Sequence, residues 1–436
     1  MDNTKAVISH IELNKWRQFN SIYINFHPRL TILTGANGSG KSTILSILEA
    51  KLVGGQPDQY LATPEEDKQT KRTVFSISSL FSSLRKAIKG EAEGNQPPIG
   101  KIKFEDGSEA VTISYPPPNQ IQYQLQFSDH KQVDGFKISS HRPIPKYQRV
   151  SDIPVGGISP KDAFEFYRQS ATSYEAGNMI RRGANQITNP LSPLKQTLIS
   201  FALHGSSNED VTAVPELQGL FRDFQNTLRR VLPKEIKFKK LNVRSAEVIV
   251  ETDTGDFPID GASGGLMSLI QTSWQIFLYS KSVSGRSVVL IDEPENHLHP
   301  SLQREFLARL VEAFPDVQYV VATHSPFIIG SVKDSSIYAL WHETIANEDG
   351  DVSKKAAVKS RPVGFEKSVG TASSVLNEIL GVSVTMPIWA EDELAAIVDS
   401  FQKEEIDEVA MRKLRFDLAE AGLSDFFPQA INRLLK

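Results

Sequence analysis

The first apolar pattern in the chain is that of β-strands followed by a helix. Ile22, Ile24 and Phe26 alternate with polar residues, as in a strand with one buried face. Residues 29–35, RLTILTG, run without interruption into a glycine-rich turn, and apolar residues within 44–48 then follow at helical spacing. The pattern predicts a strand, a glycine-rich loop and a helix, in that order.

The next part of the chain predicts an antiparallel β region. Residues 56–95 are polar and irregular, and a hairpin is expected over 101–115, turning at Asp106 and Gly107. Another alternating run covers 121–127, and a second hairpin is expected over 246–260. Short alternating runs separated by turn residues indicate antiparallel pairing.

A helical insertion is predicted at about 160–232, between these β segments. One apolar stripe in it is formed by Leu217, Phe221, Phe224, Leu228 and Val231. The stripe predicts a helix packed on the rest of the domain. No heptad pattern lasts long enough for an extended coiled coil.

Two continuous apolar runs predict central parallel strands. SVVLIDEP begins at Ser287 and ends in acids, and VQYVVATHSP begins at Val317. Helical patterns precede the first run, in 269–278, and separate the two, in 301–314. The series predicts an α/β domain with a mixed core sheet, an antiparallel β subdomain and the helical insertion.

The tail after about Gly381 is helical and charged, so we divide the chain into 1–380 and 381–436. Acids begin its first helix, where they suit the helix dipole, and apolar stripes follow. These stripes are Leu394, Ile397, Val398 and Phe401, then Leu414, Leu418 and Leu423, then Phe426, Phe427, Ile431 and Leu434. The tail either docks a partner or a second dimer, or packs back on the domain before it.

Composition excludes several classes of protein and site. With 40% hydrophobic and 23% charged residues among 436, the chain reads as a globular protein, and no signal peptide or membrane span is expected. The absence of cysteine excludes disulfides, thiolate metal sites and cysteine nucleophiles, and fits a cytoplasmic location.

The net charge of −4 argues against a protein that coats nucleic acid through many phosphate contacts. Local basic clusters exist, and we favour solvated strand rims as their explanation. The clusters are Lys234, Lys237, Lys239 and Lys240, and Arg142, Lys146 and Arg149.

The glycine-rich turn carries the most specific motif of the chain, G-x-x-x-x-G-K-[ST]. Its residues are Gly35, Ala36, Asn37, Gly38, Ser39, Gly40, Lys41 and Ser42, followed by Thr43. Backbone N–H groups of such a loop point at a β-phosphate, and the helix that follows adds its positive end. Lys41 would reach the β- and γ-phosphates and Ser42 would ligate Mg²⁺, so the motif predicts ATP as the ligand.

The two later strands end in residues suited to the same ligand. Asp292 would hold the magnesium shell, and Glu293 would polarise an attacking water. His324 ends the next strand, where a neutral imidazole could hydrogen-bond the γ-phosphate.

A second turn suited to an anion lies at the predicted start of a helix, at Ser263, Gly264 and Gly265. It cannot lie on the nucleotide face that Lys41 serves. We therefore expect it to serve a nucleotide held by another copy of the chain.

Taken in order, these four motifs resemble the ABC-type ATPase head. In that family they are called Walker A, signature, Walker B and switch histidine. The resemblance reaches from the N-terminus to about residue 340 and is greatest to the cytoplasmic RecF, SMC and OLD branch. It implies that two heads pair head-to-tail around ATP and Mg²⁺.

Further expectations follow from that resemblance. Arg17 matches a basic position that contacts nucleotide in relatives, and residues 295–300, ENHLHP, take the place of the D-loop. Its two histidines resemble a metal pair, but a dimer-interface loop fits their spacing better. The signature lacks its usual leading Leu and trailing Gln. Gln148 and Gln124 are the candidates for the magnesium-coordinating Gln loop.

The EPENHLHP form is typical of stand-alone ATPases of bacterial defence loci, such as the Septu-type (PtuA) family. Those ATPases work with an HNH nuclease subunit. Because the chain is too short for a fused nuclease domain, the resemblance implies control of a separate effector, in an anti-phage role. A RecF-type ATPase acting directly on DNA in repair or recombination is the alternative.

A different class of enzyme also matches part of the chain. Residues 261–265, GASGG, fit the G-x-S-x-G elbow of serine hydrolases, and Asp292 and His324 follow Ser263 in the order of their triad. This interpretation leaves the phosphate loop and Glu293 without a role and lacks an upstream oxyanion segment.

Overall fold

The computed structural model describes the chain in thirteen stretches, and the chain divides into two compact units, Met1–Val369 and Gly370–Lys436. The stretches are 7–66, 73–76, 98–106, 111–114, 121–142, 147–154, 157–175, 189–207, 210, 212–345, 355–363, 388–401 and 408–434. Each unit is described by itself.

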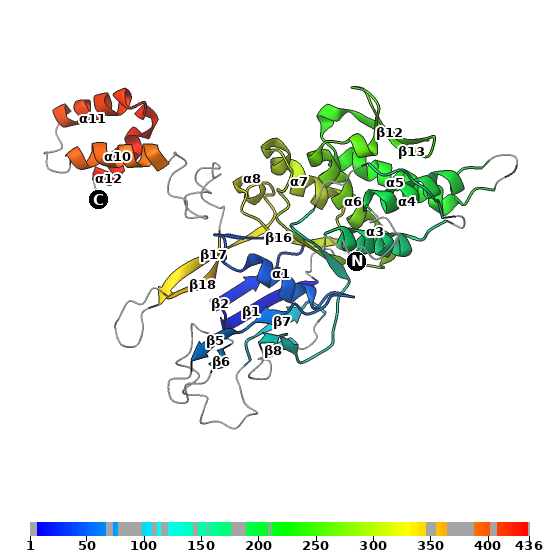
Figure 1. The fold of residues 1–436 in the computed structure, drawn as a ribbon, viewed down its shortest axis with the longest axis horizontal. Coiled ribbons are helices and arrows are strands. Elements are labelled where there is room, and N and C mark those ends of the chain that lie inside the picture. Colours follow the sequence, from blue (N-terminus) through cyan, green and yellow to red (C-terminus); the bar gives the residue numbers. More distant parts are fainter. Residues whose placement is uncertain are drawn as a thin grey trace. The chain divides into compact units, whose positions relative to one another are not determined.

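One large mixed sheet organises the first unit (Figure 1). Its strand order is β10-β8-β7-β1-β2-β18-β17-β3-β16-β15-β11. The bounds are β1 (Ile8–Trp16), β2 (Phe19–Asn25), β3 (Leu30–Gly35), β7 (Gly100–Phe104), β8 (Val111–Ser114), β10 (Gln126–Phe127), β11 (Gly135–Ile138), β15 (Ser287–Asp292), β16 (Val317–Ala322), β17 (Ser336–Ile345) and β18 (Lys355–Pro362).

The sheet has a parallel part and an antiparallel part. Strands β11, β15, β16, β3 and β17 pair in parallel, and β1, β2, β7, β8 and β10 pair antiparallel. The β17–β18 hairpin joins them, since β17 pairs with β3 and β18 with β2. The predicted antiparallel β subdomain is present, and its strands are hydrogen-bonded into the same sheet as the parallel core.

Helix α1 (Lys41–Glu49) begins directly after β3 and packs against β15 and β16. Every residue of β3, β15 and β16 is buried, which agrees with their uninterrupted apolar sequences. Leu33, Ile44 and Leu290 belong to one core cluster that continues under β1 and β2.

The other helices among the described residues of the first unit form a group that Figure 1 shows in green to yellow. They are α3 (Pro160–Glu175), α4 (Leu191–His204), α5 (Pro215–Val231), α6 (Gly264–Ser282), α7 (Pro300–Ala313) and α8 (Pro326–Ile329). Phe224 of α5 meets Trp274 of α6 edge to face, with ring centroids 4.7 Å apart. The apolar stripe predicted for the insertion is the face that packs on α6.

A three-stranded sheet lies beside these helices, in the order β12 (Phe238–Arg244), β13 (Glu247–Thr252), β14 (Phe257–Pro258). The remaining short elements of the unit are β4 (Tyr60–Leu61), β5 (Thr63–Glu66), β6 (Thr73–Ser76), β9 (Gln122–Tyr123) and the 3₁₀ turns η1 (Lys234–Ile236) and η2 (Ile259–Gly261).

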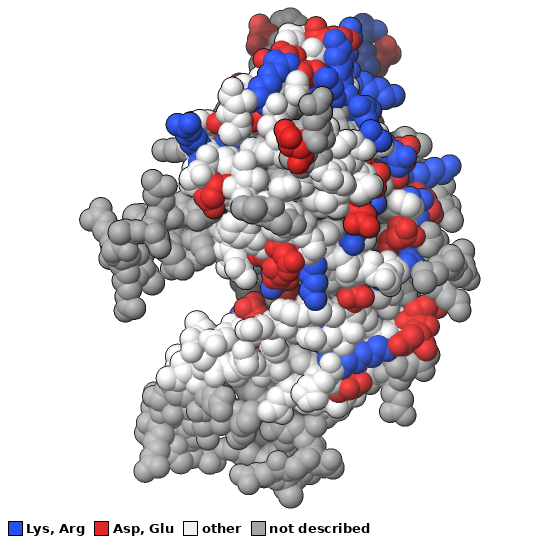
Figure 2. All heavy atoms as spheres, turned by 90° about the vertical axis from the view of Figure 1, so that its right-hand side faces the viewer, with Lys and Arg blue, Asp and Glu red and all other residues white. Residues whose placement is uncertain are grey.

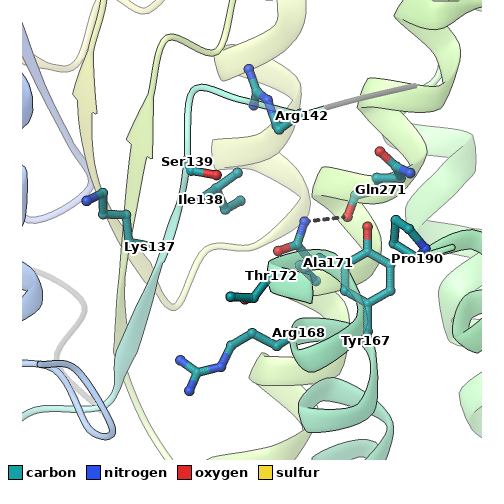
Figure 3. A pocket seen from close by; sticks show the side chains of 11 residues that line it. Lys137, Ile138, Ser139, Arg142, Tyr167, Arg168, Ala171, Thr172, Pro190 and Gln271 are labelled. Carbon is teal, nitrogen blue, oxygen red and sulfur yellow. Dashed lines mark hydrogen bonds between the residues drawn. The ribbon is translucent and has the colours of Figure 1, made fainter. Parts of the chain in front are cut away.

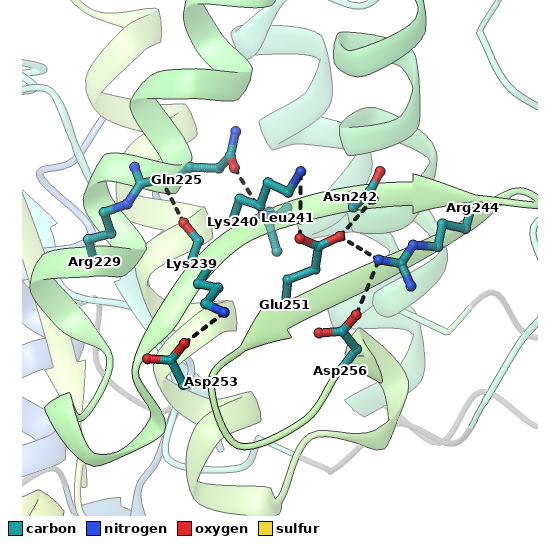
Figure 4. A network of polar contacts seen from close by, with 10 residues as sticks. All are labelled: Gln225, Arg229, Lys239, Lys240, Leu241, Asn242, Arg244, Glu251, Asp253 and Asp256. Atoms are coloured by element: carbon teal, nitrogen blue, oxygen red, sulfur yellow. Dashed lines mark hydrogen bonds and ion pairs between the residues drawn. The ribbon is translucent and has the colours of Figure 1, made fainter.

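Two of the four lysines of the β12 cluster, Lys239 and Lys240, pair with acids of the same region (Figure 4). Lys239 pairs with Asp253 at 2.7 Å, and both Lys240 and Arg244 pair with Glu251. Figure 2 shows blue and red side chains intermixed over this side of the molecule. Charge pairing of this kind fits a solvated strand rim better than a phosphate-binding surface.

The second unit is a small helical body with its own core. It contains α10 (Ile388–Phe401), α11 (Glu408–Glu420), η3 (Ser424–Phe426) and α12 (Phe427–Leu434). The apolar stripes of the tail pack on one another there, around Leu394, Leu414 and Leu418. The boundary between units lies at 369/370, eleven residues before the predicted one.

Most predicted elements of the first unit are present, with some differences. The run 121–127 is two short strands, β9 and β10, instead of one, and β4, β5 and β6 lie within the stretch expected to be irregular. Strands β11, β12, β17 and β18 were not predicted. Gly107 and Lys146 lie outside the described residues. No helix in the described part of the chain combines the length and hydropathy of a membrane span.

Candidate nucleotide-binding site

The carboxyl ends of four parallel strands converge beside the start of α1. Asp292 at the end of β15 pairs in register with Ala322, and Ala322 pairs with Leu33 of β3. Ligands of open α/β sheets bind outside the carboxyl ends of such strands. The register alone therefore brings the predicted Walker A, Walker B and switch-histidine segments to one edge.

The backbone of the loop between β3 and α1 requires glycine at its two ends. Gly35 has φ +139° and Gly40 has φ +93°, in the region that L side chains rarely adopt. A Cβ at Gly35 would lie 2.1 Å from the carbonyl oxygen of Leu340, and one at Gly40 would lie 2.4 Å from the ring of Phe19. The neighbouring strands thus press on the loop from both sides.

Lys41 is a buried cation that no carboxylate of the described residues contacts directly. Its side chain donates to the carbonyl oxygens of Gly35 and Ala36, at 3.0 and 3.1 Å. Burial lowers its pKa to about 8, although the charges of Asp292 and Glu293 oppose that shift. A cation held at such a cost is suited to bind an anion that enters from solvent.

Asp292 and Ser42 provide the oxygen atoms that Mg²⁺ prefers. Burial raises the pKa of Asp292, and the Ser42 hydroxyl, which hydrogen-bonds the carboxylate, acts against that shift. Mg²⁺ usually takes one or two carboxylates, a hydroxyl and phosphate oxygens and keeps several waters. The pair therefore fits a magnesium ion bound together with a phosphate. The described residues contain no group of three or more metal-ligating side chains.

Glu293 follows the end of β15 and has a left-handed backbone conformation. Its φ is +48°, an uncommon value for a non-glycine residue and one that is found at functional sites. The Asn296 amide donates to its carboxylate at 3.2 Å, and Arg142 donates to its carbonyl oxygen at 2.5 Å. The conformation of Glu293 is thus held by two neighbouring loops.

His324 follows β16, and Glu295 holds the loop that carries it. Burial and the charge of Lys41 lower the pKa of His324, so the imidazole is neutral at pH 7. The Glu295 carboxylate accepts from the Thr323 hydroxyl at 2.8 Å and from the backbone N–H groups of His324 and Ser325 at 2.9 and 3.2 Å. Sequence reasoning placed Glu295 in the D-loop but missed its hydrogen bonds to the His324 loop, because an acid after Asp-Glu-Pro carries no distinctive spacing.

The Ser263 turn is exposed and begins α6. Although serine is a favoured N-cap, the Ser263 side chain makes no capping hydrogen bond with its own helix. Gly265 lies close to the D-loop of the same chain, where a Cβ would be 3.3 Å from the carbonyl oxygen of His297. The turn thus presents an unused hydroxyl and the N-terminus of a 19-residue helix to solvent.

Arg17 lies in the turn between β1 and β2, next to the phosphate loop. Its guanidinium lies 5.8 Å from the centre of the Trp16 ring and 5.3 Å from that of Tyr60. Gln18 and Phe19, the next two residues, are the ones that a Cβ at Gly40 would meet. The turn is therefore adjacent to the loop, while the Arg17 guanidinium itself packs on aromatic rings.

Neither candidate for the Gln loop lies at a strand end of the site. Gln148 accepts from the backbone of Asn189, and Gln124 is exposed and donates to Pro57. The residue after β11 is Ser139, whose predecessor Ile138 pairs with Ile291. The position next to Asp292 of the neighbouring strand β15 is therefore occupied by Ser139.

The two histidines of the D-loop are engaged separately. His297 hydrogen-bonds the carbonyl oxygen of Arg142 at 2.9 Å, and His299 caps α7 by accepting from the backbone of Ser301. They do not form a metal pair. The serine-hydrolase alternative is likewise unsupported, because Asp292 hydrogen-bonds Ser42 and, within the described part of the chain, makes no hydrogen bond to His324.

A cavity of about 80 Å³ lies between β11, α3 and α6, next to this edge (Figure 3). Its lining includes Gln271, whose Nε2 has no hydrogen-bond partner among the described residues although the side chain is only 7% exposed. The Lys137 and Arg168 side chains point away from Gln271 in Figure 3, and Lys137 pairs with Glu49 at 2.8 Å. The cavity separates the strand ends from the helix that carries Ser263.

Comparison with known proteins agrees with the ATPase motifs. Residues 30–330 match the family model described as AAA domain, putative AbiEii toxin, Type IV TA system. The chain is 40% identical over 405 residues to the Retron Ec83 probable ATPase of Escherichia coli, covering 76% of this chain and 71% of that protein. It is 23% identical over 390 residues to the Septu protein PtuA of Bacillus mycoides, covering 87% of this chain. The chain spans 45% of the length of that PtuA protein.

Among solved structures, the comparison finds heads of SMC proteins. The SMC head domain from Thermotoga maritima is 13% identical, with a TM-score of 0.37, over 82% of this chain and 99% of that one. An SmcHead bound to the C-winged helix domain of ScpA is 14% identical, with a TM-score of 0.39, over 83% of this chain and 98% of that one.

Proposed function

The chain belongs to the family of AAA domains described as putative AbiEii toxin, Type IV TA system, and we propose that it hydrolyses ATP with Mg²⁺ between two heads paired head-to-tail. In such a pair, bound ATP would stabilise the interface between the heads, and hydrolysis would allow the heads to separate. Binding and slow turnover would suffice for such a clamp.

One observation carries the proposal, namely the buried Lys41 ammonium, which donates to two carbonyl oxygens at the edge where Asp292, Glu293 and His324 meet. An ATP β,γ-phosphate would supply the negative charge that the ammonium lacks. The positive end of α1 and the N–H groups of the 35–42 loop would face the same phosphates.

Each side chain of this edge has a separate chemical role in the proposal. Ser42 and Asp292 would hold the magnesium ion, which when bound neutralises phosphate charge. Glu293 would accept a proton from the attacking water, because it projects from the frayed end of β15. The neutral His324 imidazole would donate a hydrogen bond to the γ-phosphate and so sense its presence.

The Ser263 turn would complete the site of the opposite head. Its hydroxyl caps nothing in its own helix, it is exposed, and it stands at the positive end of α6. Gly264 and Gly265 would let a phosphate approach the backbone closely.

The paired heads would control a separate effector, a nuclease in an anti-phage system. The relatives that support this proposal are a Septu protein and the probable ATPases of two retrons, which are defence-related families. Direct action on DNA has less support, because Lys239, Lys240 and Arg244 of the β12 region are already paired with acids.

Glu293→Gln tests the catalytic assignment. We expect the variant to bind ATP and magnesium normally, to lose at least about 100-fold in hydrolysis, and to accumulate as ATP-dependent pairs seen by light scattering. Native turnover by this variant would show that Glu293 does not activate the water.

Ser263→Arg tests the pairing. The variant should bind ATP as a single head but fail to close, because the cation enters the γ-phosphate site of the opposite head. A mixture with Lys41→Ala should regain activity, since each mixed pair has one intact composite site. Normal hydrolysis by Ser263→Arg alone would refute the composite site.

The tail after about Gly381, which forms most of the second unit, would dock the effector or a second pair. Trp389, Val409 and Phe416 remain exposed there while the other apolar residues close its core. A chain ending at Gly381 should keep ATP binding and lose co-purification with the effector. Loss of ATP binding by the shortened chain would instead make this unit a part of the ATPase.

A further inference from the structure

A buried lysine outside the nucleotide site is tied to the segment that carries Ser263. Lys195 lies on α4, and its side chain is 0% exposed. Its ammonium is 2.8 Å from a carboxylate oxygen of Asp260 and 2.8 Å from one of Glu247, and it donates to the carbonyl oxygen of Gln148 at 2.9 Å. Burial lowers the pKa of Lys195, but the hydrogen bonds that it donates and the negative charges of Asp260 and Glu247 together outweigh burial and raise it.

The three acceptors come from three different segments. Gln148 lies in the stretch before α3, Glu247 begins β13, and Asp260 lies in η2. The Tyr147 ring lies 4.9 Å from the ammonium, and its hydroxyl donates to Glu247 at 2.9 Å. One ammonium therefore joins the helical insertion, the small sheet and the turn that precedes α6.

Asp260 is the member of this network that reaches the signature. It is 4% exposed and stands three residues before Ser263, within the 3₁₀ turn that is closed by a hydrogen bond from the Ala262 N–H to the Ile259 carbonyl oxygen. Because the backbone between Asp260 and Ser263 is short and held by this hydrogen bond, a shift of Asp260 would also shift the start of α6.

We propose that Lys195 is a positioning residue that holds the Ser263 turn in place for the nucleotide bound by the opposite head. This inference rests on the pairing proposed above. Lys195 acts in trans, because the contacts of its ammonium lie on the Ser263 side of the head and, among the described residues, include none from the phosphate loop, Asp292 or His324.

Because Lys195 acts on the site of the opposite head, mixing two inactive variants should restore activity. A misfolded Lys195 variant would not restore activity in this way. Lys195→Met should bind ATP like the native chain and lose at least about 10-fold in kcat, because leaving Asp260 unpaired displaces the turn. Mixed with Lys41→Ala, it should recover up to about a quarter of the native rate, since half of random pairs are mixed and each has one intact site.

The controls separate this inference from the pairing itself. Lys281→Met, at the other end of α6, breaks an exposed pair with Asp223 and should keep the native rate. Ser263→Arg mixed with Lys41→Ala reports on the composite site alone. Asp260→Asn, which keeps the shape of the side chain, should show the same recovery with Lys41→Ala if Lys195→Met proves insoluble.

Three results would overturn the inference. The first is a native kcat for Lys195→Met. The second is recovery of ATP hydrolysis when Lys41→Ala is mixed with Ser263→Arg but not when it is mixed with Lys195→Met or Asp260→Asn. That result would contradict the role of Lys195 while leaving the composite site supported. Failure of every mixture, including the one with Ser263→Arg, would remove the pairing and this inference together.

Discussion

Of the three lysines that are buried in the described part of the head, Lys195 and Lys41 have opposite surroundings. Lys195 is enclosed by two carboxylates and a carbonyl oxygen, and its pKa is raised. Lys41 is 5% exposed, donates to carbonyl oxygens, and has a pKa lowered to about 8. The first cation is satisfied within the chain, whereas the second is left to be satisfied by a ligand. Burial of a charge thus marks a binding site only where its partner is missing.

The contrast predicts that the same substitution changes stability in opposite directions. Lys195→Met should destabilise the head by about 3 kcal/mol, at the low end for a broken buried pair because Glu247 is 22% exposed. Lys41→Met should stabilise the nucleotide-free head at pH 7 by about 2–3 kcal/mol, because it removes a charge whose pKa is lowered. Chemical denaturation without nucleotide measures both. If both variants lost the same free energy of unfolding, the contrast between the two lysines would be wrong.

The stabilisation by Lys41→Met should also depend on pH. A lysine with a lowered pKa costs stability while it is protonated, and that cost is relieved as pH rises from about 8 to its unfolded value near 10.5. The advantage of Lys41→Met should therefore shrink over that range. A constant advantage would mean that Lys41 is not the group responsible.

Nucleotide affinity gives the next largest effect. Lys41→Met should weaken ATP binding by about 100-fold, which corresponds to losing charged hydrogen bonds to phosphate. Lys195→Met, its matched control, should bind ATP as the native chain does. Titration with a fluorescent ATP analogue separates the two, and comparable weakening in both would contradict the assignment of Lys41.

The pH profile of ATP binding is expected to be a smaller effect. Below about pH 8 Lys41 is charged and its contribution to affinity is constant, whereas above that pH affinity should fall by up to about tenfold per unit. Dissociation constants measured between about pH 6.5 and 9.5 would show the bend. A flat profile over that whole range would contradict a lowered pKa at Lys41.

The smallest expected effect concerns the nearby carboxylates that raise the pKa of Lys41. Burial lowers its pKa, and Asp292, Glu293 and Glu295 raise it. Glu293→Gln should therefore move the bend of the ATP-binding profile to lower pH, by less than about one unit for partly solvated charges. A shift to higher pH would mean that Glu293 does not act on Lys41 in this way.

The sequence predicts the parts of the site that depend on local pattern. The phosphate loop, the Asp292 strand and the His324 strand are recognisable because an apolar run and its ending residues are contiguous. Strand β11 could not be recognised in the same way, since four residues beginning with Gly135 become a strand only by pairing with β15. For the same reason, Ser139, directly after β11, was not considered when Gln148 and Gln124 were chosen as candidates for the Gln loop.

Contacts between distant residues were beyond sequence reasoning altogether. Lys195 and Asp260 are 65 residues apart, and neither belongs to a periodic pattern that would bring them together. The hydrogen bonds of Glu295 were missed because they run to residues 323–325, about 30 positions later. The fold class depends on patterns that recur along the chain, while positioning residues depend on the packing that follows.

The lowered pKa of Lys41 predicts that ATP binding to the head is coupled to the uptake of a proton. A phosphate placed against the ammonium stabilises its charged form, so the protein takes up a proton from solution when ATP arrives near pH 8. At that pH about half a proton per site is exchanged with the buffer. The heat released on binding therefore includes the ionisation heat of the buffer, and it changes between phosphate and Tris while the affinity stays the same.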